Sequence, residues 1–125
     1  MPKAVATSTR REISLPELTK TNLLPRFRTV ATGDEVTYGK PAPDLFLLAA
    51  KRLGADPSRC LVLEDAEPGV LGARRAGMQV YMVPDLQVPS ARAQQEATAI
   101  FGSLYEVATH LKMLRSEAEA PAAAV

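Results

Sequence analysis

One short segment constrains the fold of this 125-residue chain more than any other. Residues 59–65 read Arg-Cys-Leu-Val-Leu-Glu-Asp, an apolar run that ends in two carboxylates. Such a run is typical of a parallel strand buried on both faces, with Glu64 and Asp65 at its carboxyl end. Ligands of open α/β sheets collect outside the carboxyl ends of the strands, and adjacent carboxylates suit a hard cation such as Mg²⁺. The sequence therefore predicts a buried strand that leads into a metal site.

A lysine lies upstream at a place where a phosphate site would use one. Lys40 stands between Gly39 and Pro41, on a stiff connection before a predicted helix at Asp44–Leu53. Its ammonium is suited to neutralise a phosphate as a point charge. Because nearly all crossovers between parallel strands are right-handed, Lys40 and the acidic pair are expected at one edge of one sheet. Taken singly, the two segments also fit a solvated turn and a helix N-cap.

The rest of the chain alternates between strand-like and helix-like segments, which predicts an α/β fold with a mostly parallel sheet. The predicted strands are Lys3–Ala6, Thr29–Thr32, Cys60–Glu64, Val80–Val83 and Thr98–Phe101. The predicted helices lie within Thr9–Leu23 and at Asp44–Leu53, Pro68–Ala76, Ser90–Gln95 and Ser103–Arg115. The first helix is expected to begin at Ser14, where Ser14-Leu15-Pro16-Glu17 has the spacing of a capping box. Gly54 and Gly77 suit helix C-caps.

The motifs occur in an order that resembles a known family. Thr32-Gly33-Asp34-Glu35-Val36 is followed by Gly39-Lys40-Pro41-Ala42-Pro43-Asp44, Leu63-Glu64-Asp65-Ala66-Glu67-Pro68-Gly69-Val70 and Ala76-Gly77-Met78. Together they resemble the haloacid dehalogenase-like (HAD) phosphatases over residues 3–110. Pseudouridine-5'-phosphatase and the sugar-phosphatase or β-phosphoglucomutase types are the branches that look most similar. The resemblance implies a Rossmann-like, HAD-type three-layer sandwich.

The resemblance also implies a role for each matching residue. Thr7 corresponds to the hydroxyl that hydrogen-bonds the transferring phosphoryl group, with Ser8 and the following amides beside it. Lys40 corresponds to the catalytic lysine that holds the nucleophile and the phosphate together. Asp65 and Glu64 correspond to the acids that position Mg²⁺, with Asp65 the preferred metal contact. Thr7 and Ser8 also fit a plain structural cap.

One family motif is missing. HAD phosphatases open with an Asp-x-Asp-Gly motif on their first strand, and this chain contains none. The sequence is therefore expected to represent the C-terminal half of the family's core domain at residues 1–114, followed by a flexible tail at residues 115–125. The first, central strand and the cap domain that selects the substrate would be absent. Asp34 and Asp44 are not at the place of the nucleophile, and Asp44 is expected to be a helix N-cap.

A sheet without its central strand has three ways to respond. Leu61–Glu64 could pair directly with Lys3–Ala6, a complementing chain could fill the slot, or the open edges could drive association between copies of the chain. These alternatives stay open from the sequence alone.

The leading functional hypothesis is the C-terminal portion of a Mg²⁺-dependent HAD hydrolase that acts on a small phosphorylated sugar or nucleotide such as pseudouridine 5'-phosphate. Without the aspartyl nucleophile and general acid, the chain alone is expected to be inactive. The alternative is a non-catalytic module that binds phosphate, metal or another protein. A third reading is an incomplete fragment with no independent function.

Composition narrows the partners. A formal net charge of +1 gives no electrostatic case for nucleic acid or a membrane surface, and no apolar run is long enough to span a bilayer. The single cysteine, Cys60, cannot form an internal disulfide and is expected to be a small core side chain. His110, the one histidine, is expected on a helix surface. A cytoplasmic setting with a small phosphorylated metabolite as the partner follows as an expectation.

Overall fold

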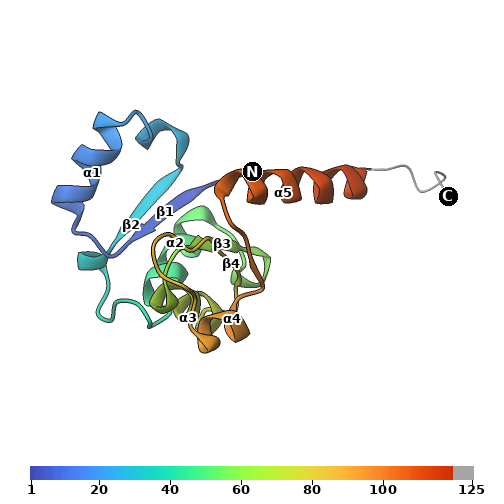
Figure 1. Cartoon of the computed structure of the whole chain (residues 1–125). Helices are drawn as coiled ribbons and strands as arrows, with labels where there is room; N and C mark the ends of the chain where they lie inside the picture. The colour runs from blue at the N-terminus through green and yellow to red at the C-terminus, as the bar shows by residue number, and fades with distance from the viewer. Residues whose placement is uncertain (120–125) are drawn as a thin grey trace.

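The computed structural model describes residues 1–119 and has an α/β architecture with parallel strands (Figure 1). The strands are β1 (Ala4–Thr7), β2 (Thr29–Thr32), β3 (Leu61–Glu64), β4 (Gln79–Met82) and β5 (Ala99–Ile100). The α-helices are α1 (Arg11–Lys20), α2 (Asp44–Leu53), α3 (Glu67–Arg75), α4 (Ala91–Glu96) and α5 (Leu104–Glu119). Short 3₁₀ helices lie at η1 (Leu24–Arg26), η2 (Gly33–Glu35) and η3 (Pro57–Arg59). The predicted fold class is confirmed.

The strands form two separate sheets. β1 pairs with β2 in one sheet, and β3, β4 and β5 form the other in that order, with parallel neighbours throughout. No ladder joins β1 to β3 within residues 1–119. The alternative in which Lys3–Ala6 pairs directly with Leu61–Glu64 is therefore wrong. A cavity, described below, lies between the two strands, and each keeps one open edge.

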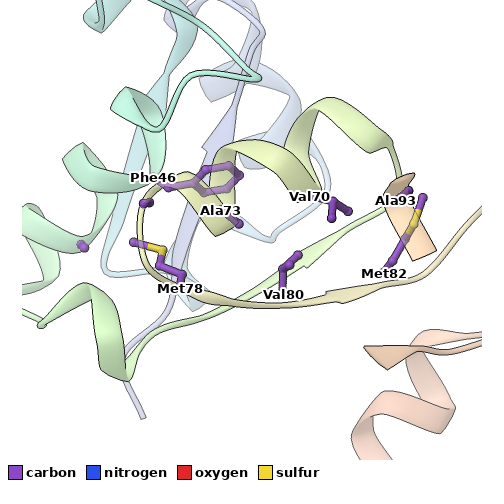
Figure 2. Close-up of a cluster of buried hydrophobic side chains, with 9 residues drawn as sticks. Phe46, Val70, Ala73, Met78, Val80, Met82 and Ala93 are labelled. Atoms are coloured by element: carbon purple, nitrogen blue, oxygen red, sulfur yellow. The ribbon is translucent and has the colours of Figure 1, made fainter. Parts of the chain in front are cut away.

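Helix α2 joins the two sheets because its side chains belong to two apolar clusters. Leu45 and Ala49 pack with Ala31 of β2 in the smaller cluster. Phe46 and Ala50, each one position further along the helix, belong to the larger cluster under α3 and β4. Figure 2 shows the larger cluster, with Phe46, Val70, Ala73, Met78, Val80, Met82 and Ala93 labelled. One helix thus fixes the first sheet against the second.

The predicted burial of β3 on both faces is wrong. Leu61 and Leu63 are 36% and 46% exposed, whereas Val62 packs against the larger cluster. The strand is an edge strand covered by α3 on one face, so it alternates as a half-buried strand does. Cys60, just before it, packs against the same cluster, and burial raises the pKa of its thiol.

Helix α1 begins at Arg11, three residues before the predicted start at Ser14. The backbone N–H of Arg11 donates to Oδ1 of Asp34 at 3.1 Å, so a carboxylate from η2 satisfies the start of the helix. The hydroxyl of Ser14 donates back to the carbonyl of Arg10 at 2.9 Å and caps nothing. A tertiary contact therefore overrides the local capping signal, and Pro16 lies inside the helix.

The other helix boundaries lie close to the predicted ones. Asp44 is the first residue of α2, and its predicted role as N-cap is wrong because Pro43 holds that position without a side-chain hydrogen bond. Gly54 (φ 66°) is the C-cap of α2, and Gly77 (φ 79°) follows α3. Both adopt the left-handed conformation that glycine tolerates best, but only Gly54 is a C-cap as predicted, because Ala76 holds that position in α3 and Gly77 comes one residue later.

Helix α5 continues to Glu119, past its predicted end at Arg115, and projects away from the two sheets (Figure 1). The expected tail at residues 115–125 therefore starts within a helix, and residues 120–125 lie outside the described part of the chain. The division into a core domain at residues 1–114 and a tail stays a prediction. Across residues 1–119, no helix combines the length and apolarity needed to cross a membrane.

His110 lies on α5 as expected, but its side chain is half-buried and packs against other rings. Its ring lies 5.7 Å from that of Tyr81 on β4 and 5.3 Å from that of Phe101, measured between centroids. The half-buried imidazole thus packs α5 against the second sheet.

Candidate active site

A cavity of about 650 Å³ lies at the carboxyl ends of β1 and β3. It is lined by the five residues that the sequence predicts for the site, namely Thr7, Ser8, Lys40, Glu64 and Asp65, and by Ala6, Thr9, Leu63, Ala66, Pro68, Gly69, Val83 and Leu104. The predicted convergence of lysine and acids at one edge is therefore present in the structure. The edge is split, because its two halves belong to different sheets.

Lys40 reaches across the split. Its ammonium donates to the carbonyl oxygen of Ala6 on β1 at 3.3 Å and forms an ion pair with Glu64 on β3. It also lies 5.0 Å from the ring centroid of Phe46, close enough for a cation–π contact. The side chain is only 14% exposed. One partly buried charge therefore contacts both strands that border the cavity.

The two adjacent acids are not equivalent. The side chain of Glu64 is 10% exposed and is neutralised by Lys40. Asp65 is exposed at the cavity, and it makes no hydrogen bond or ion pair with any residue in the described part of the chain. Of the two carboxylates, Asp65 is the one left unpaired within residues 1–119, and its role as the preferred metal contact stays a prediction.

The loop after β1 carries the predicted phosphate contacts. The Oγ1 of Thr7 accepts the backbone N–H of Thr9 at 3.2 Å, while Ser8 is exposed. The carbonyl of Ser8 packs directly against Gly33, where a Cβ would overlap the carbonyl oxygen. Gly33 therefore permits η2 to lie against this loop.

A network of charges supports η2 from the other side. Glu35 accepts hydrogen bonds from Arg52 at 2.9 and 3.0 Å and from the backbone and hydroxyl of Thr32. Arg11 adds a longer contact at 3.4 Å. The Arg52 guanidinium is the main cause that lowers the pKa of Glu35 to about 2. This network braces the end of β2 and the loop beside the site.

Sequence reasoning missed residues that shape the site without chemistry of their own. The carboxylate of Glu64 lies where a Cβ of Gly69 would be, and Arg75 donates to the carbonyl of Pro41 at 3.0 Å. A glycine inside a helical pattern is the signal that could have drawn attention to Gly69, since glycine costs helix stability relative to alanine. The contact of Arg75 joins residues 34 positions apart and has no local signature.

The donor set fits Mg²⁺ in chemistry. Mg²⁺ takes hard oxygen ligands and is commonly held by one or two carboxylates together with substrate phosphate oxygens and water. Asp65 supplies such a carboxylate, with Glu64 beside it. Within residues 1–119, no group of three or more His, Cys, Asp or Glu side chains forms a ready-made metal cage. The site therefore suits a metal whose coordination is completed by phosphate oxygens and water.

The fold and the arrangement of the site are those of an α/β protein of the HAD class, and comparison with known proteins agrees. The family model for haloacid dehalogenase-like hydrolases matches residues 1–83, which include all five predicted site residues. The chain therefore belongs to the haloacid dehalogenase-like hydrolase family, as the sequence motifs predicted.

Individual relatives support this assignment. A Drosophila melanogaster protein described provisionally as a pseudouridine-5'-phosphatase is 53% identical over 72 residues, which are 56% of this chain and 31% of the relative. The (DL)-glycerol-3-phosphatase 2 of Arabidopsis thaliana is 41% identical over 112 residues, which cover 85% of this chain and 46% of the relative. A crystal structure from Thermotoga maritima, described provisionally as a β-phosphoglucomutase, superposes with a TM-score of 0.82 at 31% identity. The superposition covers 90% of this chain and 53% of that structure's chain. The chain thus spans less than half of these curated relatives and about half of the solved structure.

Proposed function

We propose that this chain provides the phosphate-binding and metal-binding half of a phosphomonoester hydrolase site. The observation that carries the proposal is the meeting of Lys40, Thr7 and Asp65 at one cavity. The Lys40 ammonium would stabilise charge on the phosphoryl oxygens, and the Thr7 hydroxyl with Ser8 would orient them. Asp65, assisted by Glu64, would hold Mg²⁺, which when bound supplies Lewis-acid stabilisation of the phosphate.

The covalent step needs a group that is not among the residues lining the cavity. Phosphoryl transfer to an aspartate requires a nucleophile and a positioned proton donor, whereas Asp65 and Glu64 are assigned to the metal and to Lys40. We propose that a strand filling the slot between β1 and β3 supplies these groups, from a complementing chain. The open parallel edges of both strands support this arrangement.

The proposed substrate is a small phosphorylated sugar or nucleotide, pseudouridine 5'-phosphate among them. The names of the relatives support this class, since they include one provisional pseudouridine-5'-phosphatase and a glycerol-3-phosphatase. A cytoplasmic setting belongs to the proposal, supported by the single cysteine.

One observation favours the non-catalytic alternative. Lys40 is already neutralised by Glu64, so the cavity carries less free positive charge than an open lysine would give. Binding without hydrolysis is therefore the second candidate function, and the two are separated by measuring binding and turnover on the same protein.

Calorimetric titration with inorganic phosphate in the presence of Mg²⁺ tests the proposal. We expect Lys40→Ala to weaken phosphate binding by about tenfold or more, the loss expected for one charge-assisted contact. Asp65→Asn should weaken Mg²⁺ binding. Lys51→Ala and Asp85→Asn serve as matched controls, because both residues are exposed and neither lines the cavity.

Hydrolysis of p-nitrophenyl phosphate separates the two candidates. The chain alone should give a flat baseline, and addition of a polypeptide bearing the complementing strand should produce Mg²⁺-dependent turnover that Lys40→Ala abolishes. Phosphate binding without turnover in the complemented state would support the non-catalytic module. Absence of both Mg²⁺ and phosphate binding would overturn the proposal.

A further inference from the structure

Glycine 69 occupies an unusual place in the site. It is a buried residue in the first turn of α3, and the carboxylate of Glu64 lies against its backbone. A Cβ built on Gly69 would overlap all three carboxyl atoms of Glu64, and these are its nearest neighbours. The space that a side chain would take at position 69 is thus the space in which the carboxylate sits.

This placement controls the ion pair of the site. Glu64 can meet Lys40 in the observed geometry only while its carboxylate rests on the bare backbone of α3. Lys40 in turn is held by that carboxylate and by the carbonyl of Ala6. A methyl group at position 69 would push the carboxylate off its seat and leave the ammonium with one partner fewer.

The same face of α3 also touches the lysine side of the site. Gly72, one helical turn further on, would bring a Cβ to 3.0 Å from the carbonyl oxygen of Ala42. Arg75, three residues later again, donates to the carbonyl of Pro41 at 3.0 Å. α3 therefore supports both partners of the ion pair, with Gly69 under the glutamate and Gly72 and Arg75 beside the loop that follows Lys40.

We infer that Gly69 is a positioning residue that fixes the Lys40–Glu64 pair. The importance of the pair for phosphate binding rests on the proposed function, but its geometry does not. Glycine is a poor helix former relative to alanine, so a purely structural helix would gain from alanine here. The two effects of Gly69→Ala, on the helix and on the pair, therefore have opposite signs.

Chemical labelling of lysines tests the inference without any ligand. The folded protein is treated with a limiting amount of acetic anhydride, and acetylation of Lys40 is measured by mass spectrometry relative to exposed Lys51. We expect Gly69→Ala to raise the ratio of Lys40 to Lys51 labelling by at least about threefold, a factor typical of coupling between contacting residues. Glu64→Ala should raise it similarly, and the double variant should add nothing further.

The urea midpoint of each variant provides the second readout. If Gly69→Ala leaves the midpoint unchanged or higher while Lys40 labelling rises, the residue positions the pair and does not hold the fold. If Gly69→Ala unfolds the chain and Glu64→Ala in the same chain restores folding, the overlap is demonstrated directly. An unchanged labelling ratio, additive effects in the double variant, or unfolding in both backgrounds would overturn the inference.

The outcome is independent of the proposed function. A chain that binds neither phosphate nor Mg²⁺ would still show the change in Lys40 labelling if Gly69 seats Glu64. Conversely, phosphate binding that Lys40→Ala removes would stand even if Gly69→Ala had no effect on labelling.

Discussion

At the scale of single residues, the contacts of the Lys40 ammonium organise the site. The ammonium is paired with Glu64 and the carbonyl of Ala6, and it lies over Phe46, so this loop side chain has partners on two strands and a helix. The sequence predicted that Lys40 and Glu64 share an edge, because strand order and crossover handedness are enough for that. It did not predict their ion pair, which we infer depends on the packing of the Glu64 carboxylate against the backbone of Gly69.

Glu35 gives a prediction about pH. Its pKa is about 2 in the folded chain and 4.5 as the ordinary value, so between these pH values the unfolded state binds more protons. The free energy of unfolding should therefore fall as the pH is lowered from about 4.5 to about 2. Glu35→Gln should remove this part of the dependence and cost about 1 kcal/mol at pH 7, a value kept small because the residue is partly solvated.

Urea denaturation as a function of pH checks this. Glu12→Gln is the matched control, since Glu12 forms only an exposed pair with Arg10 at 3.8 Å. A Glu35→Gln curve parallel to wild type from pH 5 to 2 would contradict the assignment of the lowered pKa to Glu35.

Gly33 gives a prediction about close approach. A methyl group there would overlap the backbone carbonyl of Ser8, which cannot rotate away as a side chain can. Gly33→Ala should lower the free energy of unfolding by about 1–3 kcal/mol, as overpacking does. Gly39→Ala is the control, because nothing lies within 4 Å of its added Cβ, and it should stay within about 0.5 kcal/mol of wild type. Equal effects of the two changes would count against the contact.

At the scale of elements, the sequence predicted helices best where the local pattern and the tertiary contacts agree. α2 and α3 bury the apolar residues that their spacing indicates, among them Leu45, Phe46, Val70 and Ala73. α1 began elsewhere because Asp34, distant in sequence, caps it. The prediction that both faces of β3 are buried failed for the face with Leu61 and Leu63. An apolar run alone does not show whether a second layer of structure covers that face.

The proline inside α1 offers a test at this scale. Pro16 has no N–H to donate to the carbonyl four residues earlier, and its ring crowds that turn. Pro16→Ala should raise the free energy of unfolding by about 1–2 kcal/mol, since part of the roughly 3 kcal/mol helix penalty is offset by the greater freedom of the unfolded chain. Pro25→Ala, at the start of η1 where proline is tolerated, should bring no gain. Urea denaturation of both variants decides; a gain for Pro25→Ala alone would contradict the argument.

At the scale of the whole molecule, the two sheets meet only partly. α2 joins them through its two apolar clusters, while β1 and β3 keep open edges on either side of the cavity. The sequence predicted the slot from the motif that is lacking. The sequence left three responses to the slot: direct pairing of β1 with β3, a complementing chain, or association between copies. The structure eliminates only direct pairing, which depends on contacts between segments far apart in the sequence.

The open edge of β3 leads to a prediction about association. Leu63 is exposed on this strand and lines the cavity, so copies of the chain, in the absence of a complementing strand, should associate through this region. Leu63→Lys should lower the weight-average mass measured by sedimentation at high concentration. Leu86→Lys, at a residue 93% exposed and away from the cavity, should leave it unchanged. A wild-type monomer at all concentrations would contradict the prediction.

The double contact of Lys40 has a consequence for the mechanics of the molecule. Under the proposed function, a phosphate that attracts the ammonium would compete with the carbonyl on one sheet and the carboxylate on the other, so phosphate occupancy and the separation of the sheets would be thermodynamically linked. Whatever loosens the contacts of Lys40 with Ala6 and Glu64 would strengthen binding of the anion, and an anion that binds tightly would in turn loosen those contacts. The lysine would thereby make the distance between the two sheets sensitive to what is bound between them.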